Sequence, residues 1–176
     1  MSETTDTSAT RRKTRDIGWL TLVIVLSIVM CAPFARTVGW LGDEGILLHG
    51  AERALRGHKL YLETFSFLPP GGYFIAQLWL AVAGVTLMSV RLLAIATIAG
   101  AAGFTFLACR EACRHAPTAA AIALGWVLMS QGSWTQVSYH WFCVVFMMIG
   151  AWISLQPATP RRALAAGIAI GAGGMI

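Results

Sequence analysis

Charge is the scarcest property of this sequence. Only 12% of its 176 residues are charged, whereas a soluble globular domain is typically about a quarter charged. No acidic residue follows Glu111, and no charged residue lies between Arg114 and Arg161. Such stretches do not suit the solvated surface of a soluble domain. Because 57% of the residues are hydrophobic and the mean hydropathy is +0.68, we expect an all-α, polytopic membrane protein.

Several chemical motifs are missing as well. The four cysteines occur in no Cys-x-x-Cys or Cys/His arrangement that would hold zinc. There is no Walker loop and no glycine fingerprint of a dinucleotide-binding fold. The net charge of +5 comes from short basic clusters beside apolar runs, so nucleic acid is not an expected partner. The basic clusters instead predict membrane topology.

Apolar runs divide the chain into its expected parts. A basic tail over 1–16 is expected to be disordered in the cytoplasm, and a first transmembrane helix follows over 17–35. An outer loop with juxtamembrane helices is expected over 36–90, and a helical membrane bundle over 91–176. About five transmembrane helices are expected in all. The last apolar run is too short for a complete span, so we expect the sequence to be truncated.

The run from Gly71 to Val90 decides the topology, because every later loop changes side if this run crosses the bilayer. If it does not cross, eight of the 13 basic residues lie in the cytoplasm, and if it crosses, five do. Because positive charge is enriched on the cytoplasmic side, we expect an interfacial helix after the Pro-Pro pair, with Tyr73, Gln77 and Trp79 among the lipid headgroups. A simple span of about 18 apolar residues is the alternative.

An amphipathic helix is predicted from Asp43 to Arg56, ended by Gly57. Asp43 and Glu44 stand at its N-terminus, near the end of the first membrane helix. Carboxylates there stabilise a helix by about 0.3 to 1 kcal/mol, and aspartate is a favoured N-cap, so a purely structural role is one interpretation. A pair of carboxylates at the membrane surface also suits a general base or a metal ligand.

The order of these elements resembles the N-terminal part of the C-type (GT-C) membrane glycosyltransferases, which include protein O-mannosyltransferases and lipid A aminoarabinose transferases. The matching positions are Asp43 and Glu44, Gly57 to Tyr61, Pro69, Pro70, Tyr73, Gly84 and Arg91. The resemblance implies transfer of a sugar from a polyprenyl-phosphate carrier to a glycan, lipid or protein acceptor. The reaction would take place on the non-cytoplasmic face of a bacterial-type plasma membrane. Many relatives have a basic residue where this chain has Leu68, which leaves that phosphate contact to other residues.

The resemblance also implies roles for particular residues. Asp43 would be the catalytic base, and Glu44 would orient it or help it to bind a divalent metal, Mg²⁺ or Mn²⁺. The candidates for substrate binding are Arg53, Arg56, Lys59, Tyr61, Tyr73, Arg91 and His140, of which the four cations would contact the lipid phosphate. Each cation also has a simpler interpretation as a solvated or headgroup-facing charge.

Two other functions remain open at this point. A transporter or flippase component would carry ionisable residues inside its membrane spans, where they mark a substrate path. A non-catalytic multi-span membrane protein would use Asp43 only as a helix cap.

Overall fold

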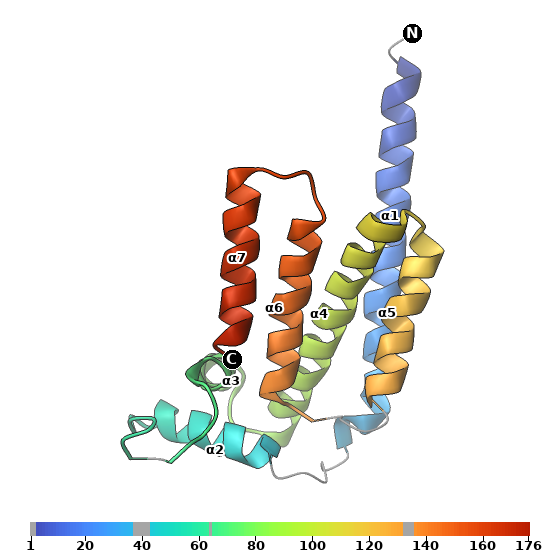
Figure 1. Ribbon diagram of the computed structural model, residues 1–176. Helices are drawn as coiled ribbons and strands as arrows, with labels where there is room; N and C mark the ends of the chain where they lie inside the picture. Colours follow the sequence, from blue (N-terminus) through green and yellow to red (C-terminus); the bar gives the residue numbers. More distant parts are fainter. Residues whose placement is uncertain (1–2, 37–42, 64, 132–135) are drawn as a thin grey trace.

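The computed structural model describes residues 3–36, 43–63, 65–131 and 136–176, and side chains from Thr14 onward except those of Asp43 and Gln131. Across these residues the chain is all-helical and forms no strand, which confirms the all-α part of the predicted fold class. Five long helices stand side by side. Two shorter helices, α2 (Asp43–Leu55) and α3 (Pro70–Ala83), lie across one end of this bundle (Figure 1).

The first helix, α1 (Glu3–Cys31), continues into a 3-10 turn, η1 (Ala32–Arg36). It begins well before the apolar run and so includes most of the segment 1–16 that was expected to be disordered. No glycine or proline occurs between Glu3 and Ile17. Because these are the two residue types that most strongly oppose helix, nothing in this segment stops the helix from extending beyond the apolar run.

The remaining long helices alternate in direction. They are α4 (Leu87–Cys113), α5 (Ala116–Gln131), α6 (Tyr139–Ser154) and α7 (Pro160–Gly174). The helix α4 starts at the end of the bundle where α1 finishes, and it packs against α1, α5 and α6, while α6 packs against α7 (Figure 1). The helices expected over 91–176 therefore correspond to α4, α5, α6 and α7.

Local sequence explains where several helices begin and end. Thr86, Ser138 and Thr159 precede α4, α6 and α7, and the hydroxyl of each accepts a hydrogen bond from a backbone N–H in the first turn. Such N-caps satisfy donors that the helix itself leaves unpaired. Gly57 follows α2 with a φ of +90°, as predicted for a glycine that ends a helix.

Two buried clusters hold the bundle together. One joins α2 and α3 to α4 and α6, and its largest members include Leu47, Tyr73 and Phe142. The other fills the space between α1, α4 and α5, where Ala119 and Ala123 are completely buried. Small side chains at such positions let helices approach closely, as is common among membrane helices.

Within the described part of the chain, two helical segments are long and apolar enough to cross a bilayer, Thr14–Arg36 and Leu87–Cys113. The apolar helices Ala116–Ser130 and Tyr139–Ser154 are shorter. A signal sequence or the core helix of a soluble protein can satisfy the same criteria of length and composition. By their length and composition, the two segments indicate membrane association.

The helix α3 starts at Pro70, and its 14 residues are fewer than the ~20 that a span requires. The expectation that Tyr73 faces lipid headgroups is wrong. Tyr73 is only 1% exposed, and its hydroxyl lies 2.7 Å from the Ser66 hydroxyl. The Trp79 Nε1–H donates to the backbone oxygen of Ser89 at 2.9 Å. The Tyr73 ring is therefore buried with its hydroxyl paired inside the protein, whereas Trp79 is half-buried and its indole N–H is paired.

Candidate functional site

The acidic pair lies where α1 ends and α4 begins. The helix α2 starts at Asp43, as predicted, but the Asp43 side chain lies outside the described residues. The Glu44 side chain is described and is only 12% exposed. A carboxylate this deeply buried requires compensating partners, because its transfer from water is costly.

Glu44 has two such partners, both far from it in sequence. Its Oε1 accepts hydrogen bonds from Nη1 of Arg91, near the start of α4, and from the backbone N–H of Val137, just before α6, at 2.9 Å. The Arg91 side chain is 2% exposed. One carboxylate thus joins three elements of the fold, and we call the Glu44, Arg91 and Val137 contacts the carboxylate clasp.

The clasp changes the interpretation of Arg91. This residue was expected to contact a lipid phosphate, but the structure buries it against Glu44. The Nε of Arg91 has no hydrogen-bond partner among the described atoms. The same is true of the side-chain amide of Gln136, which precedes Val137 and is 2% exposed. The Val137 contact was missed by sequence reasoning, because a backbone N–H has no sequence signature.

The described residues do not fit a divalent metal at this position. Among them, no group of three His, Cys, Asp or Glu side chains could hold a metal ion. Mg²⁺ requires near-octahedral oxygen coordination, and the one described carboxylate of the pair already pairs with Arg91. A metal on Glu44 would have to compete with that cation, so we assign no chemistry to Mg²⁺ or Mn²⁺.

The other three predicted phosphate contacts lie at the far end of α2. Arg53 is nine residues beyond Glu44, or about 13 Å along the helix axis, and its Nη2 donates to the backbone oxygen of Glu63 at 3.4 Å. Lys59 is exposed in the following loop. Arg56 forms a surface ion pair with Glu52, and their side chains are 71% and 31% exposed. The structure therefore does not bring these cations to the clasp.

The hydroxyls of Tyr61 and Tyr73 both form hydrogen bonds to residues of the loop that joins α2 to α3. The Tyr61 hydroxyl donates to the backbone oxygen of Leu68 at 2.6 Å, and the Tyr61 φ of 68° is in the left-handed region. Burial, with a smaller repulsion from Tyr73, raises the pKa of Tyr61. In the same loop, hydrogen bonds from His58 and from a backbone N–H lower the pKa of Glu63. Both tyrosines therefore hold the loop in its fold.

His140 is the predicted site residue that stays exposed close to the clasp. It follows Val137 by three residues, in the first turn of α6. Its ring stacks on Tyr139 with centroids 4.0 Å apart, and its Nδ1 lies 3.0 Å from the Ser138 hydroxyl oxygen. The imidazole is thus oriented by its neighbours at the same end of the bundle as Glu44.

A hollow of about 320 Å³ opens beside the Glu44 carboxylate. Its lining comes from α2, from the end of α3 and from the start of α4: Glu44, Leu48, His49, Glu52, Leu80, Val85, Thr86, Leu87 and Val90. Its polar lining groups are carboxylate and imidazole from α2 and the Thr86 hydroxyl at the start of α4, and the remaining lining side chains are aliphatic. Pockets of ~300 Å³ or more with a few polar groups are typical of small-molecule sites.

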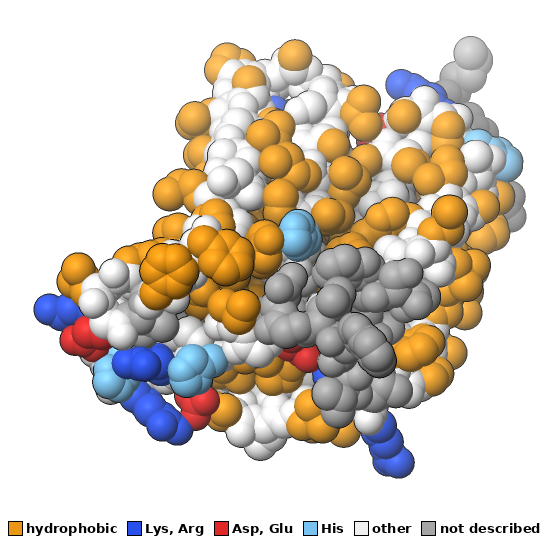
Figure 2. Space-filling model, turned by 60° about the horizontal axis from the view of Figure 1, so that its bottom comes forward, with side chains coloured by type: hydrophobic (Ala, Val, Ile, Leu, Met, Phe, Trp, Pro, Cys, Tyr) orange, Lys and Arg blue, Asp and Glu red, His pale blue; other side chains and the backbone are white. Residues whose placement is uncertain are grey.

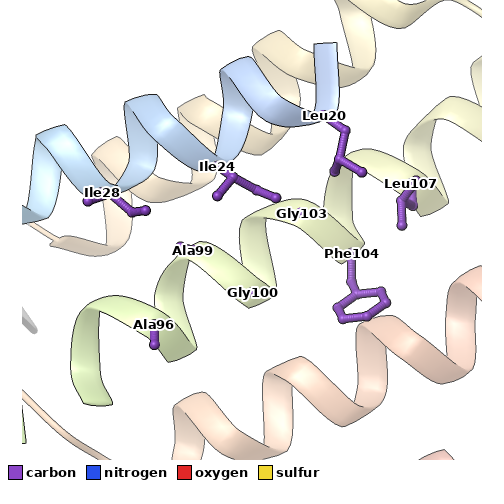
Figure 3. A pocket seen from close by; sticks show the side chains of 9 residues that line it. All are labelled: Leu20, Ile24, Ile28, Ala96, Ala99, Gly100, Gly103, Phe104 and Leu107. Carbon is purple, nitrogen blue, oxygen red and sulfur yellow. The ribbon is translucent and has the colours of Figure 1, made fainter. Parts of the chain in front are cut away.

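An apolar groove of about 360 Å³ runs between α1 and α4. Figure 3 shows Leu20, Ile24 and Ile28 of α1 above the small residues Ala96, Ala99, Gly100 and Gly103 of α4, with Phe104 and Leu107 at one end. The groove starts near Ala96, five residues beyond Arg91, or about 7 Å along the helix axis. It therefore leads along the bundle toward the clasp.

The chain matches no model of a known protein family, no curated protein and no solved structure.

Proposed function

We propose that this chain is the membrane-embedded part of a glycosyltransferase that takes its sugar from a polyprenyl-phosphate carrier. The observation that carries the proposal is the carboxylate clasp. By joining Glu44 to Arg91 and Val137, the clasp holds the start of α2, the helix that begins at Asp43, beside a ligand-sized hollow at the end of the bundle. The order of sequence motifs described above supports the same function.

In the proposed reaction, the acceptor hydroxyl oxygen attacks the anomeric carbon of the sugar and Asp43 accepts the hydroxyl proton. The bond between the anomeric carbon and the phosphate oxygen breaks, and polyprenyl phosphate leaves with the bonding electrons. Glu44 is a positioning residue in this scheme, because it holds the start of α2 in place through Arg91 and Val137 and takes no part in the proton transfer. The apolar groove between α1 and α4 suits the prenyl chain of the carrier.

The proposed protein is multi-pass, with α2 and α3 on the non-cytoplasmic side. The opposite end of the bundle carries Arg110, whose guanidinium binds the Asp16 carboxylate at 3.0 and 3.1 Å, and Arg114, where α4 ends. Basic residues at this end suit the cytoplasmic side.

A transport function has less support from the placement of charge. The charged residues of α4 are Arg91 in its first turns and Arg110 and Glu111 in its last ones. The intervening residues 92–109 carry no charge, and a substrate path through a membrane bundle usually requires one.

The Asp43→Asn variant tests the proposal, because asparagine also suits a helix start but cannot act as a base. In membranes supplied with undecaprenyl-phosphate-linked mannose, glucose or 4-aminoarabinose, release of undecaprenyl phosphate would be measured. We expect at least a ~100-fold loss of the rate for the active donor. Glu63→Gln, an exposed carboxylate far from the clasp, is the matched control and should keep the rate. Full activity of Asp43→Asn would remove Asp43 from the reaction.

Cys113, which is exposed near the end of α4, allows a test of topology. In a variant with Cys113 as its only cysteine, a membrane-impermeant maleimide added to intact spheroplasts should label nothing until the membrane is permeabilised. A cysteine at Lys59 on the same background should be labelled at once. The opposite pattern would place the acidic pair in the cytoplasm, away from the proposed substrate.

A further inference from the structure

Six large apolar side chains project from the segment that connects α2 to α3 and from the outer side of α3. They are Leu62, Phe65, Phe67, Phe74, Leu78 and Val82, and each is between 59% and 91% exposed. We call this surface the wedge. Scattered apolar residues are normal on a protein surface, but a concentration of this kind marks a site of interaction.

The wedge is one surface although it comes from two elements. Phe74 of the wedge lines a hollow of about 370 Å³ together with Gln77 of α3 and with Leu60 and Tyr61, which directly precede Leu62 in the connecting segment. The start of the connecting segment therefore lies beside the outer side of α3.

The helix α3 is apolar on both of its sides. Tyr73, Ala76 and Leu80 are buried against the protein, whereas Phe74 and Val82 point outward. A helix that is hydrophobic all round belongs in an apolar environment rather than at a water surface. The outer side of α3 therefore lacks a polar face that water would solvate.

Charge beside the wedge indicates what covers it. In the segment 52–63, the three cations Arg53, Arg56 and Lys59 outnumber the two anions Glu52 and Glu63. Figure 2 shows charged side chains gathered next to large apolar ones at the end of the molecule that carries α2 and α3. An apolar surface with a basic border is complementary to acyl chains and phosphate headgroups.

We propose that the wedge inserts into one leaflet of a phospholipid bilayer and that Leu62, Phe65 and Phe67 of the connecting segment are its membrane anchor. The wedge lies at the end of the bundle where the two candidate spans, in α1 and α4, end and begin (Figure 1). Insertion at this level would place Lys59 among the headgroups and Phe65 below them. The proposal requires that the bundle is embedded in a membrane, but it does not require that the protein transfers a sugar.

Depth-dependent quenching tests the anchor. Single cysteines at Phe65, Val25 and Arg56 would each carry an environment-sensitive NBD dye in a cysteine-free background of the full chain. The proteins would be placed in nanodiscs of phosphatidylglycerol and phosphatidylcholine brominated on its acyl chains. Val25 on the exposed side of α1 is the reference for the bilayer interior, and Arg56, 71% exposed in the basic border, is the reference for the water-accessible headgroup region.

We expect acyl-chain bromine to quench the dye at Phe65, though less than at Val25, because an interfacial apolar surface reaches only about 5–10 Å into the bilayer. The dye at Arg56 should be quenched by aqueous iodide instead. Because Phe65 is 91% exposed, its replacement leaves the fold intact. Bromine quenching at Val25 without bromine quenching at Phe65 would refute insertion of the wedge, whether water or protein covers position 65, but would leave the membrane placement of the bundle standing. Loss of bromine quenching at both positions would overturn the membrane placement as well.

Discussion

The carboxylate clasp makes a quantitative prediction about stability. Arg91→Met removes the cation and leaves the Glu44 carboxylate, 12% exposed, without its charged partner. Breaking a buried ion pair in this way costs about 3–5 kcal/mol. Adding Glu44→Gln should restore most of this loss, because the double variant no longer buries a charge. We therefore predict that the effects of the two substitutions on the free energy of unfolding are strongly non-additive.

The assay is a double-mutant cycle on the purified chain in detergent micelles, with the free energy of unfolding measured by chemical denaturation. The pair of Glu52 and Arg56 on α2 is the control, because its side chains are 31% and 71% exposed. An exposed pair of this kind is worth at most about 1 kcal/mol. Equal coupling energies for the two pairs, or an additive double variant at Glu44 and Arg91, would refute the clasp as a buried ion pair.

Two further predictions concern the end of the bundle that carries α2 and α3. A Cβ atom at Gly50 would lie 2.3 Å from the buried Tyr73 ring, so Gly50→Ala should lower the free energy of unfolding by about 1–3 kcal/mol, whereas Gly45→Ala, with open space around it, should not. His58 lowers the pKa of Glu63, so this contact is intact above the ordinary glutamate pKa and is lost as the pH falls through the lowered value. In an NMR titration, His58→Ala should raise the pKa of Glu63.

Much of the helical fold could be predicted because its signals are local. The apolar runs marked the long helices, Gly57 marked the end of α2, and the Pro-Pro pair marked the start of α3. The length of α1 could not be predicted from apolarity, because its N-terminal turns are polar and the sequence there shows only that helix-breaking residues are missing.

The clasp could not be predicted because its partners are 47 and 93 residues from Glu44. In the sequence, Arg91 is one of several cations near the membrane, and nothing distinguishes the one that will be buried. The burial of the Tyr73 side chain could not be predicted for a related reason. Both sides of α3 are apolar, so periodicity could not show which side faces the protein and which side forms the wedge.

The clasp also determines how substitutions at the acidic pair can be interpreted. Because Glu44 is joined to Arg91 and Val137, its removal would disturb the start of α2 and lower activity even if Glu44 never meets a substrate. Loss of activity in Glu44→Gln alone therefore cannot identify a catalytic group. If Glu44 is a positioning residue, activity lost in Arg91→Met should return in part when Glu44→Gln restores stability. Activity that stays absent in this stable double variant would instead mean that the Glu44 carboxylate takes part in the chemistry.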